Sequence, residues 1–287
     1  MKKLLSLLLC LALCLSCAPA HAAAEPETAS SGDYEYVRLP GGGAEITKYT
    51  GGAESLEIPA ELDGLAVASI GAGAFADCNS LRSVTIPDGV VALGDGAFQG
   101  CEHMSFLTIP DSLVSVGANP LSGCESLTRL LLSPDNPALA VIDGVLFSKA
   151  DRRLVNYPWA FTDPSWQIPQ GIASIGSYAF FWNGYLTSVT IPDSVHAIEE
   201  GAFYACHRLE SVVIPDGVTS IGDEAFFDCG RLTSVTIPDS VASIGEDAFS
   251  ECPKLTLTVG RGSFAAQYCK DNGLLYTYPD ANDWLKG

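Results

Sequence analysis

Cysteine is the residue type with the most evident capacity for chemistry in this chain, because it recurs at one place in a repeated sequence. Six cysteines share that place and a seventh follows them: Cys78, Cys101, Cys124, Cys206, Cys229, Cys252 and Cys269. Cysteines of an exported protein often form disulfide bonds, and adjacent repeats are close enough for bonding geometry. The odd number favours a column of buried free thiols. Zinc is not expected, since there is no Cys-x-x-Cys pair and no histidine at ligand spacing.

The histidines do not complete a catalytic set with these thiols. His103 and His207 directly follow repeat cysteines or their neighbours, and His196 stands where other repeats carry valine or threonine. Nucleophilic catalysis needs a base that a third group orients, and adjacent residues such as Cys206 and His207 rarely face each other. Glycine-rich nucleotide-binding motifs are also missing from the sequence. We therefore expect no enzyme activity and no cofactor, with the histidines solvated in loops.

Five aspartates form a second recurring set, because each directly follows a proline at the end of an expected strand. They are Asp88, Asp111, Asp193, Asp216 and Asp239. Stacked repeats would bring several of these carboxylates into columns, where a Ca²⁺ ion could relieve their repulsion with oxygen ligands. Each aspartate can instead accept hydrogen bonds from the backbone of its own turn. We expect the turn role, and calcium binding is the alternative.

The start of the chain and its charge predict an exported protein. Lys2 and Lys3 precede an apolar run from Leu4 to Leu15 and then small residues, which is the layout of a secretory signal peptide. Cleavage is expected after Ala22, and lipidation at Cys17 is the alternative. No later apolar run is long enough to span a bilayer. With 15 basic and 34 acidic residues the net charge is −19, which argues against nucleic acid or an anionic membrane surface as partner.

A 23-residue period organises most of the chain, and residues 81–103 set it out as LRSVTIPDGVVALGDGAFQGCEH. Related units occupy residues 104–126, 163–185, 186–208, 209–231 and 232–254, with a longer one from Ser55. In the unit quoted, Val84 and Ile86 alternate with polar residues as a short strand requires. Pro87 then ends the strand because it has no N–H to donate. Such units bury their apolar sides only against one another, so the period predicts a solenoid.

The pattern Leu-x-x-Val-x-Ile, followed in each unit by Ala-Phe-x-x-Cys, resembles the leucine-rich repeats of BspA-like bacterial surface proteins. AEITKYTGG at residues 44–52 looks like the N-terminal strands of that family, residues 136–158 look like its irregular unit, and residues 260–276 look like its C-terminal cap. The resemblance implies a β-rich right-handed solenoid, with short parallel strands stacked on one face and turns and short helical segments on the other. It also implies that Asn183, which stands at the cysteine position, meets backbone groups inside its turn.

The expected organisation follows from the repeat and the resemblance. The segments are a signal peptide at 1–22, a flexible linker at 23–33, N-terminal cap strands at 34–54, the leucine-rich repeat solenoid at 55–254 with an irregular unit at 127–162, and a C-terminal cap and tail at 255–287. Two units depart from the pattern: Glu199 replaces a glycine, and Asn119 opens a segment that replaces Ala-Phe. Both departures predict locally altered bends.

The outward residues of the strands form the face on which solenoids usually bind. Most are serine or threonine, but apolar and guanidinium groups interrupt them in the middle of the chain, and such groups are common binding anchors. The candidate ligand-binding residues are Phe106, Thr108, Arg129, Leu131, Leu154, Asn156, Gln167 and Thr190. The equal alternative is that the irregular unit folds over this patch. Phe181 and Trp182 face another side and are expected to pack under the irregular unit with Trp159 or Phe161, although an aromatic binding platform is an alternative.

The resemblance also supplies the functional expectation. BspA-like proteins are associated with adhesion to host matrix proteins or to other cells. The implied partner is a protein or glycan on a host or neighbouring cell surface, and the implied location is secreted or at the cell surface. Nutrient capture by a glycan- or peptide-binding module is the alternative, favoured if the central patch is hollowed into a pocket. The apparent caps at both ends predict a monomer.

Overall fold

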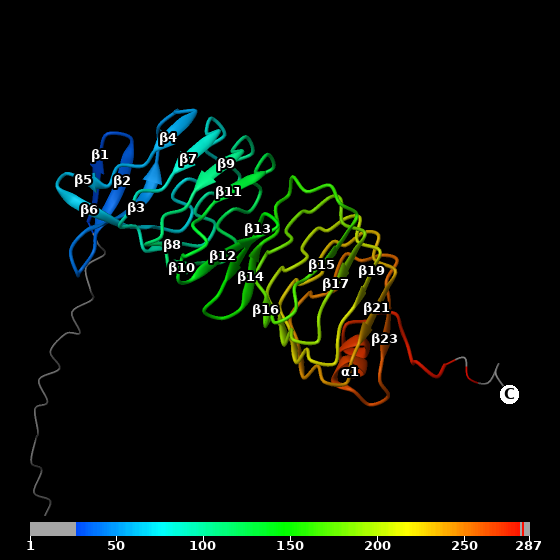
Figure 1. The fold of residues 1–287 in the computed structure, drawn as a ribbon. Coiled ribbons are helices and arrows are strands. Elements are labelled where there is room, and N and C mark those ends of the chain that lie inside the picture. Colours follow the sequence, from blue (N-terminus) through cyan, green and yellow to red (C-terminus); the bar gives the residue numbers. More distant parts are fainter. Residues whose placement is uncertain (1–26, 282, 284–287) are drawn as a thin grey trace, which may run out of the picture.

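Each repeat of the sequence forms one turn of a solenoid, here called a rung, and the rungs stack along one axis (Figure 1). The structure is a computed structural model, and it describes residues 27–281 and 283. The expected signal peptide, with Cys17 and its cleavage site, lies outside the described residues. The predicted β-rich solenoid is confirmed. Its strands form sheets on two opposite sides, and each side is divided into an N-terminal and a C-terminal sheet.

The described part of the chain begins with a small cap of antiparallel strands. They are β1 (Thr28–Ser31), β2 (Tyr34–Arg38) and β3 (Ala44–Tyr49). Strand β3 then pairs in parallel with β6 (Leu65–Ile70), which also forms a hairpin with β5 (Glu61–Leu62). The expected linker at residues 23–33 therefore includes a strand, because β1 pairs with β2 along the whole length of β1. The β1 sequence Thr-Ala-Ser-Ser has no apolar alternation that would predict this strand.

The N-terminal half of the solenoid, residues 28–131, contains the first of the two outward strand faces. Its four parallel strands are β4 (Ser55–Glu57), β7 (Ser83–Thr85), β9 (Phe106–Thr108) and β11 (Arg129–Leu131). On the opposite side, β8 (Ala92–Leu93) and β10 (Ser115–Val116) extend the sheet that begins in the cap. The parallel register between β9 and β11 equals one repeat, so equivalent side chains lie beside each other.

The C-terminal half, residues 153–277, repeats this plan. Its strand face consists of β15 (Ser165–Gln167), β17 (Ser188–Thr190), β19 (Ser211–Val213), β21 (Ser234–Ile237), β23 (Thr256–Val259) and β24 (Tyr276–Thr277). The opposite sheet contains β16 (Ser174–Ile175), β18 (Ala197–Ile198), β20 (Ser220–Ile221) and β22 (Ser243–Ile244). Helix α1 (Phe264–Asp271) closes the end. Ser263 caps it by accepting a hydrogen bond from the N–H of Ala266, and Ala265 and Cys269 are buried on its inner side.

The irregular unit separates the two halves. It forms β12 (Leu139–Ile142), β13 (Val145–Ser148) and β14 (Arg153–Asn156) as an antiparallel meander in the middle of the solenoid (Figure 1). Strand β14 joins the opposite sheet through parallel pairing with β16. Tyr157 then takes the place of a repeat phenylalanine, since its ring stacks on Phe180 with centroids 5.0 Å apart. The strand face is consequently interrupted between β11 and β15.

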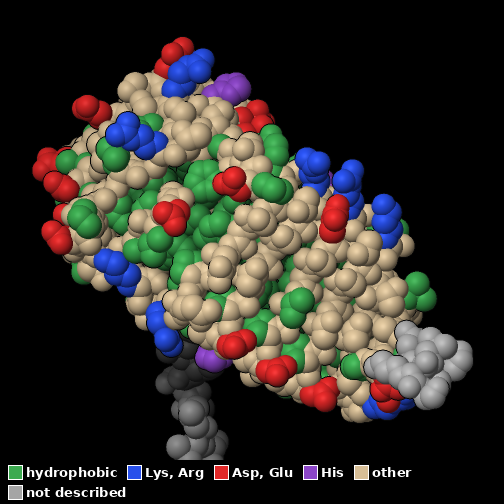
Figure 2. Space-filling view, turned by 45° about the vertical axis from the view of Figure 1, so that its right-hand side comes forward, with side chains coloured by type: hydrophobic (Ala, Val, Ile, Leu, Met, Phe, Trp, Pro, Cys, Tyr) green, Lys and Arg blue, Asp and Glu red, His purple; other side chains and the backbone are tan. Residues whose placement is uncertain are grey.

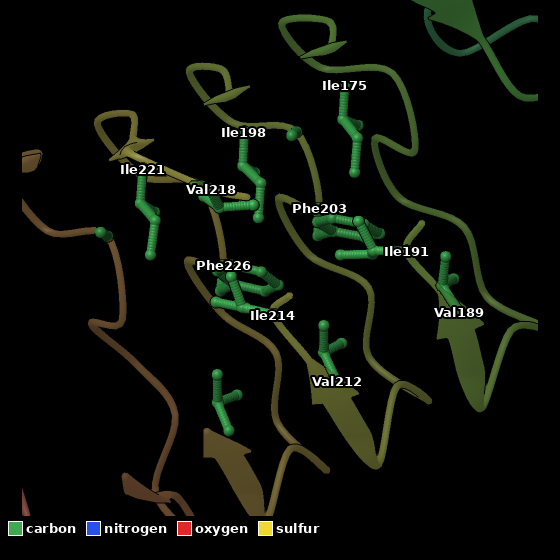
Figure 3. Packing of buried hydrophobic residues seen from close by; sticks show 14 of the residues in the cluster. Ile175, Val189, Ile191, Ile198, Phe203, Val212, Ile214, Val218, Ile221 and Phe226 are labelled. Carbon is green, nitrogen blue, oxygen red and sulfur yellow. The ribbon is translucent and has the colours of Figure 1, made fainter. Parts of the chain in front are cut away.

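Identical positions of successive rungs form the core. Figure 3 shows Val189 and Val212 projecting inward from their strands, and Phe203 and Phe226 lying one above the other. These two rings stack at 5.0 Å with an interplanar angle of 7°. The valines and the phenylalanines are buried. Because each rung presents the same apolar set to its neighbours, repetition of one short sequence is enough to fill the interior.

The predicted thiol column is present. All seven cysteines of the described residues are free, and five of them are buried. The thiol of Cys206 lies 3.1 Å from the carbonyl oxygen of Phe180, and the thiol of Cys229 lies 3.2 Å from that of Phe203. Asn183 fills the same place in its rung and accepts hydrogen bonds from the N–H groups of Tyr185 and Leu186. The position therefore holds a small polar group that bonds to backbone inside the turn.

Candidate functional site: the strand faces

Strands β9 and β11 place three of the candidate residues together on the N-terminal strand face. Phe106 and Arg129 are paired neighbours in the parallel register, and the Arg129 guanidinium lies over the Phe106 ring, 5.6 Å from its centroid. Leu131 follows on β11, is 41% exposed, and lies beside Thr108. These side chains point away from the core because β-strand residues alternate between the two faces. An aromatic ring, a cation held over it and an open aliphatic side chain thus share one surface.

The irregular unit does not fold over this patch. Arg129 is exposed and Leu131 keeps 41% of its surface open, although residues 132–138 leave the strand immediately afterwards. Strand β11 ends the four-stranded sheet, so the patch lies at the edge where the strand face is interrupted. Of the two alternatives drawn from the sequence, the open one is the arrangement that forms.

Leu154 and Asn156 were assigned to this face wrongly. Both belong to β14, which pairs with β16 on the opposite side of the solenoid, with Leu154 beside Ile175. Leu154 is 0% exposed and Asn156 is 4% exposed. The physical reason is the hairpin of the irregular unit, which returns the chain to the opposite sheet and shifts these residues to core positions.

Gln167 and Thr190 lie on the C-terminal strand face, where they are exposed neighbours on β15 and β17. The next rung places Val213 beside Thr190, and Val213 is 70% exposed. A groove of about 560 Å³ crosses this face, with hydroxyl groups of β17 and β19 and the carboxylates of Asp193 and Asp216 in its lining. The sequence did not single out this groove, because a row of serines and threonines carries no signal of a hollow.

Phe181 and Trp182 do not pack under the irregular unit, which corrects the expectation. Phe181 stacks on Tyr204 of the next rung with centroids 5.5 Å apart, and Trp182 contacts His207 edge to face at 5.6 Å. Phe161 contacts Tyr157 instead. Phe181 stacks on Tyr204 because the two residues occupy equivalent positions of adjacent rungs, whereas the strands of the irregular unit belong to the opposite sheet.

The aspartates at the strand ends are exposed, and their carboxylates make no hydrogen bond within residues 27–281. The turns are closed differently from our expectation. The N–H of Val90 donates to the Pro87 carbonyl at 3.4 Å, and the N–H of Gly89 donates to the hydroxyl of Ser112 in the next rung at 3.0 Å. No group of three or more potential metal ligands occurs in the described part of the chain.

The charge and the thiols of the described residues set limits on chemistry. Acidic side chains are scattered over the visible face and exceed the basic ones (Figure 2). Burial raises the pKa of the Cys206 thiol to about 12, so this cysteine is a poor nucleophile at neutral pH. Within the described ranges, no helix has the length and apolar character needed to cross a membrane.

Comparison with protein families identifies the repeat. A model of the BspA type leucine-rich repeat region, in six copies, matches residues 48–163 and 161–263. The chain belongs to the BspA-type leucine-rich repeat family. No curated protein matches the sequence of this BspA-type protein.

Solved structures share its fold. The pneumococcal vaccine antigen PcpA is 18% identical with a TM-score of 0.58, and the match covers 82% of each chain. A leucine-rich repeat protein from Eubacterium ventriosum is 20% identical with a TM-score of 0.51, over 80% of this chain and 82% of that one. Both show the same stacked-repeat architecture.

Proposed function

We propose that this BspA-type protein is exported and binds a protein on a host or neighbouring cell through its N-terminal strand face. The family and fold support a role in protein interaction. The observation that carries the choice of surface is the Arg129–Phe106 pair with Leu131 beside it. Arginine and aromatic residues are the side chains that most often dominate binding energy at protein interfaces.

The geometry of the pair favours binding over a purely structural role. The Arg129 guanidinium is held over the Phe106 ring at 5.6 Å, and no salt bridge to Arg129 occurs in residues 27–281. Its position above the ring reduces the rotamer entropy that binding would otherwise remove, and pre-organisation of this kind raises affinity. A partner can therefore cover an aromatic ring, a charge and an aliphatic side chain without reordering them.

Adhesion, rather than catalysis, is the proposed outcome of this binding. Attachment to the cell would come from the lipid expected at Cys17 in the alternative processing, or from a bound partner. A catalytic role would require a nucleophile and an oriented base in one pocket, whereas the six repeat thiols bond to backbone carbonyls inside the turns.

The test is binding of the purified protein to a panel of immobilised host matrix proteins. The variant Phe106→Ala/Arg129→Ala removes both anchors, and Ser234→Ala/Thr236→Ala on β21 of the C-terminal strand face is the matched control. We expect saturable binding to at least one matrix protein, weakened by about a hundredfold in the first variant, since each hot-spot truncation costs roughly 1–2 kcal/mol. Unchanged affinity in that variant, or equal losses in both, would refute the choice of surface. Circular dichroism confirms that both variants fold.

A further inference from the structure

A cleft of about 530 Å³ opens between the two halves of the solenoid, away from both strand faces. Four rungs contribute to it, and its most informative lining residues are Asp95, Gln99, Asn119, Tyr178, Phe181 and Glu200. Its volume lies within the range of small-molecule sites. These residues lie within the matched repeats but outside the binding surface proposed above.

The cleft exists because two rungs are held apart. Neighbouring rungs are normally joined on this side by backbone hydrogen bonds, such as that from the N–H of Phe98 to the Pro120 carbonyl at 2.8 Å. Among the described residues, no backbone hydrogen bond joins residues 117–124 to residues 176–183. The Asn119 side chain spans the interval instead. Its amide donates to the Tyr178 carbonyl and accepts from Asn156 at 2.8 Å. Asn119 is 3% exposed, so a buried side chain fixes the width of the cleft.

Aromatic rings form one wall, and their positions are fixed. The Tyr178 hydroxyl donates to Glu200 at 2.6 Å, and its ring lies so close to Gly201 that a Cβ there would be 2.2 Å from it. Phe181 meets Tyr178 edge to face at 5.9 Å and stacks on Tyr204. Burial and the bond to Glu200 raise the pKa of Tyr178, so its hydroxyl stays protonated and keeps this bond at neutral pH.

The polar groups of the cleft offer both donors and acceptors. Asp95 uses one carboxylate oxygen to accept from the N–H of Ala118 at 2.7 Å, and Glu200 uses one to accept from Tyr178. The second oxygen of each carboxylate, and the side-chain amide of Gln99, make no hydrogen bond to other described residues. These groups are therefore available to a ligand, and the amide supplies N–H donors as well as an acceptor.

We propose that this cleft binds a short neutral oligosaccharide. Fixed aromatic rings offer a surface for the apolar C–H face of a sugar, and carboxylates and amides together can bond to neighbouring hydroxyls. The lining contains no lysine, arginine or histidine, which disfavours sialylated, sulfated or phosphorylated ligands. A lysine ammonium could use only the acceptors of this set, which are the carboxylates and the Gln99 amide oxygen, and would leave the amide N–H donors without a partner. The mixed set therefore favours the neutral sugar.

Two variants test the site without disturbing the fold. Phe181→Ser removes a ring from the wall, and serine occupies the equivalent position in another rung as Ser250. Glu200→Gln keeps an acceptor for Tyr178 and removes the charge. The matched controls, Phe227→Ser and Glu246→Gln, make the same changes at equivalent positions outside the cleft.

The experiment is calorimetric titration of the purified protein with maltotriose, cellotriose, N,N′,N″-triacetylchitotriose and trilysine. We expect saturable binding of at least one of the three neutral trisaccharides, at least about tenfold weaker in each cleft variant, which corresponds to about 1.4 kcal/mol. The controls should stay within about twofold of the wild type, which is below about 0.5 kcal/mol. The proposal is overturned if no trisaccharide binds, if the controls lose as much as the cleft variants, or if only trilysine binds. Retention of sugar binding by Phe106→Ala/Arg129→Ala would show that this site is independent of the strand face.

Discussion

Four buried rings, Phe180, Phe203, Phe226 and Phe249, stack in an inner column. Removing one of these rings should reveal how strongly each rung stabilises its neighbours. Phe203 is 0% exposed and stacks on Phe180 at 4.7 Å and on Phe226 at 5.0 Å. Phe203→Ala removes a buried ring together with contacts on both sides, and changes of this kind cost about 3–5 kcal/mol. For a chain of this size, 1 kcal/mol lowers Tm by about 2–4 °C. We therefore expect a fall in Tm of about 6–20 °C.

The matched control is Phe227→Ala in the outer column, which consists of the partly exposed rings of Phe181, Tyr204 and Phe227. Phe227 stacks on Tyr204 at 5.0 Å but lies half-buried at the surface, so its loss should cost about 1 kcal/mol. Thermal unfolding followed by far-ultraviolet circular dichroism measures both variants. A fall in Tm for Phe203→Ala no larger than that for Phe227→Ala would refute the view that the inner column couples the rungs.

Four further predictions concern the backbone, the thiol count, the pH dependence of stability and the turns. Gly222→Ala should destabilise the protein by about 1–3 kcal/mol, because the added Cβ would lie 2.5 Å from the backbone nitrogen of Glu200 in the previous rung. The control Gly230→Ala should leave the stability unchanged, because a Cβ there would meet no atom within 4 Å. Equal melting temperatures of the two variants would contradict this. Thiol titration of the denatured mature chain should find seven free thiols, and fewer than seven thiols would indicate disulfide bonds. In the native protein, Cys78 and Cys252 should react first because they are only partly buried. Burial raises the pKa of Cys206 to about 12, above the pKa of about 8.5 in an unfolded chain. Its contribution to the free energy of unfolding is therefore complete below about pH 8.5 and declines as the pH rises toward 12, which urea titrations at several pH values would show. Calcium should leave Tm unchanged, since the turn aspartates point to solvent; a rise in Tm would indicate a metal site.

The repeated part of the fold was predictable because one physical pattern recurs. Alternation of Val84 and Ile86 with polar residues sets the inward and outward faces of a strand, and the 23-residue period places the same residues beside one another. Cysteine or asparagine at the inner turn position also follows the period. Every repeat supports the same interpretation, so agreement among them compensates for the weakness of a three-residue strand signal.

The irregular unit was not predictable in the same way. Its residues have no equivalent in the other repeats, so Leu154 and Asn156 were aligned to outward positions that the hairpin in fact moves to the opposite sheet. Strand β1 was missed because pairing with β2, rather than its own composition, makes it a strand.

Three residues of the cleft stand at or beside departures from the repeat pattern. Asn119 departs from the repeat, Glu200 follows the departure at Glu199, and Phe181 is an aromatic residue at a position where most repeats carry a small or polar one. The sequence predicted altered bends for the departures. The sequence alone does not show that Asn119 and Tyr178 are neighbours in space, because the irregular unit lies between their rungs in the sequence. Their contact is visible only in the folded structure.

The claim that the N-terminal strand face is the binding surface is tested most directly by hydrogen–deuterium exchange. The protein would be measured alone and saturated with a matrix protein that binds it. We expect slower exchange in peptides that contain β9 and β11, with no change across residues 186–254. Protection confined to the C-terminal half or to the turns, or the failure of every matrix protein to bind, would contradict it.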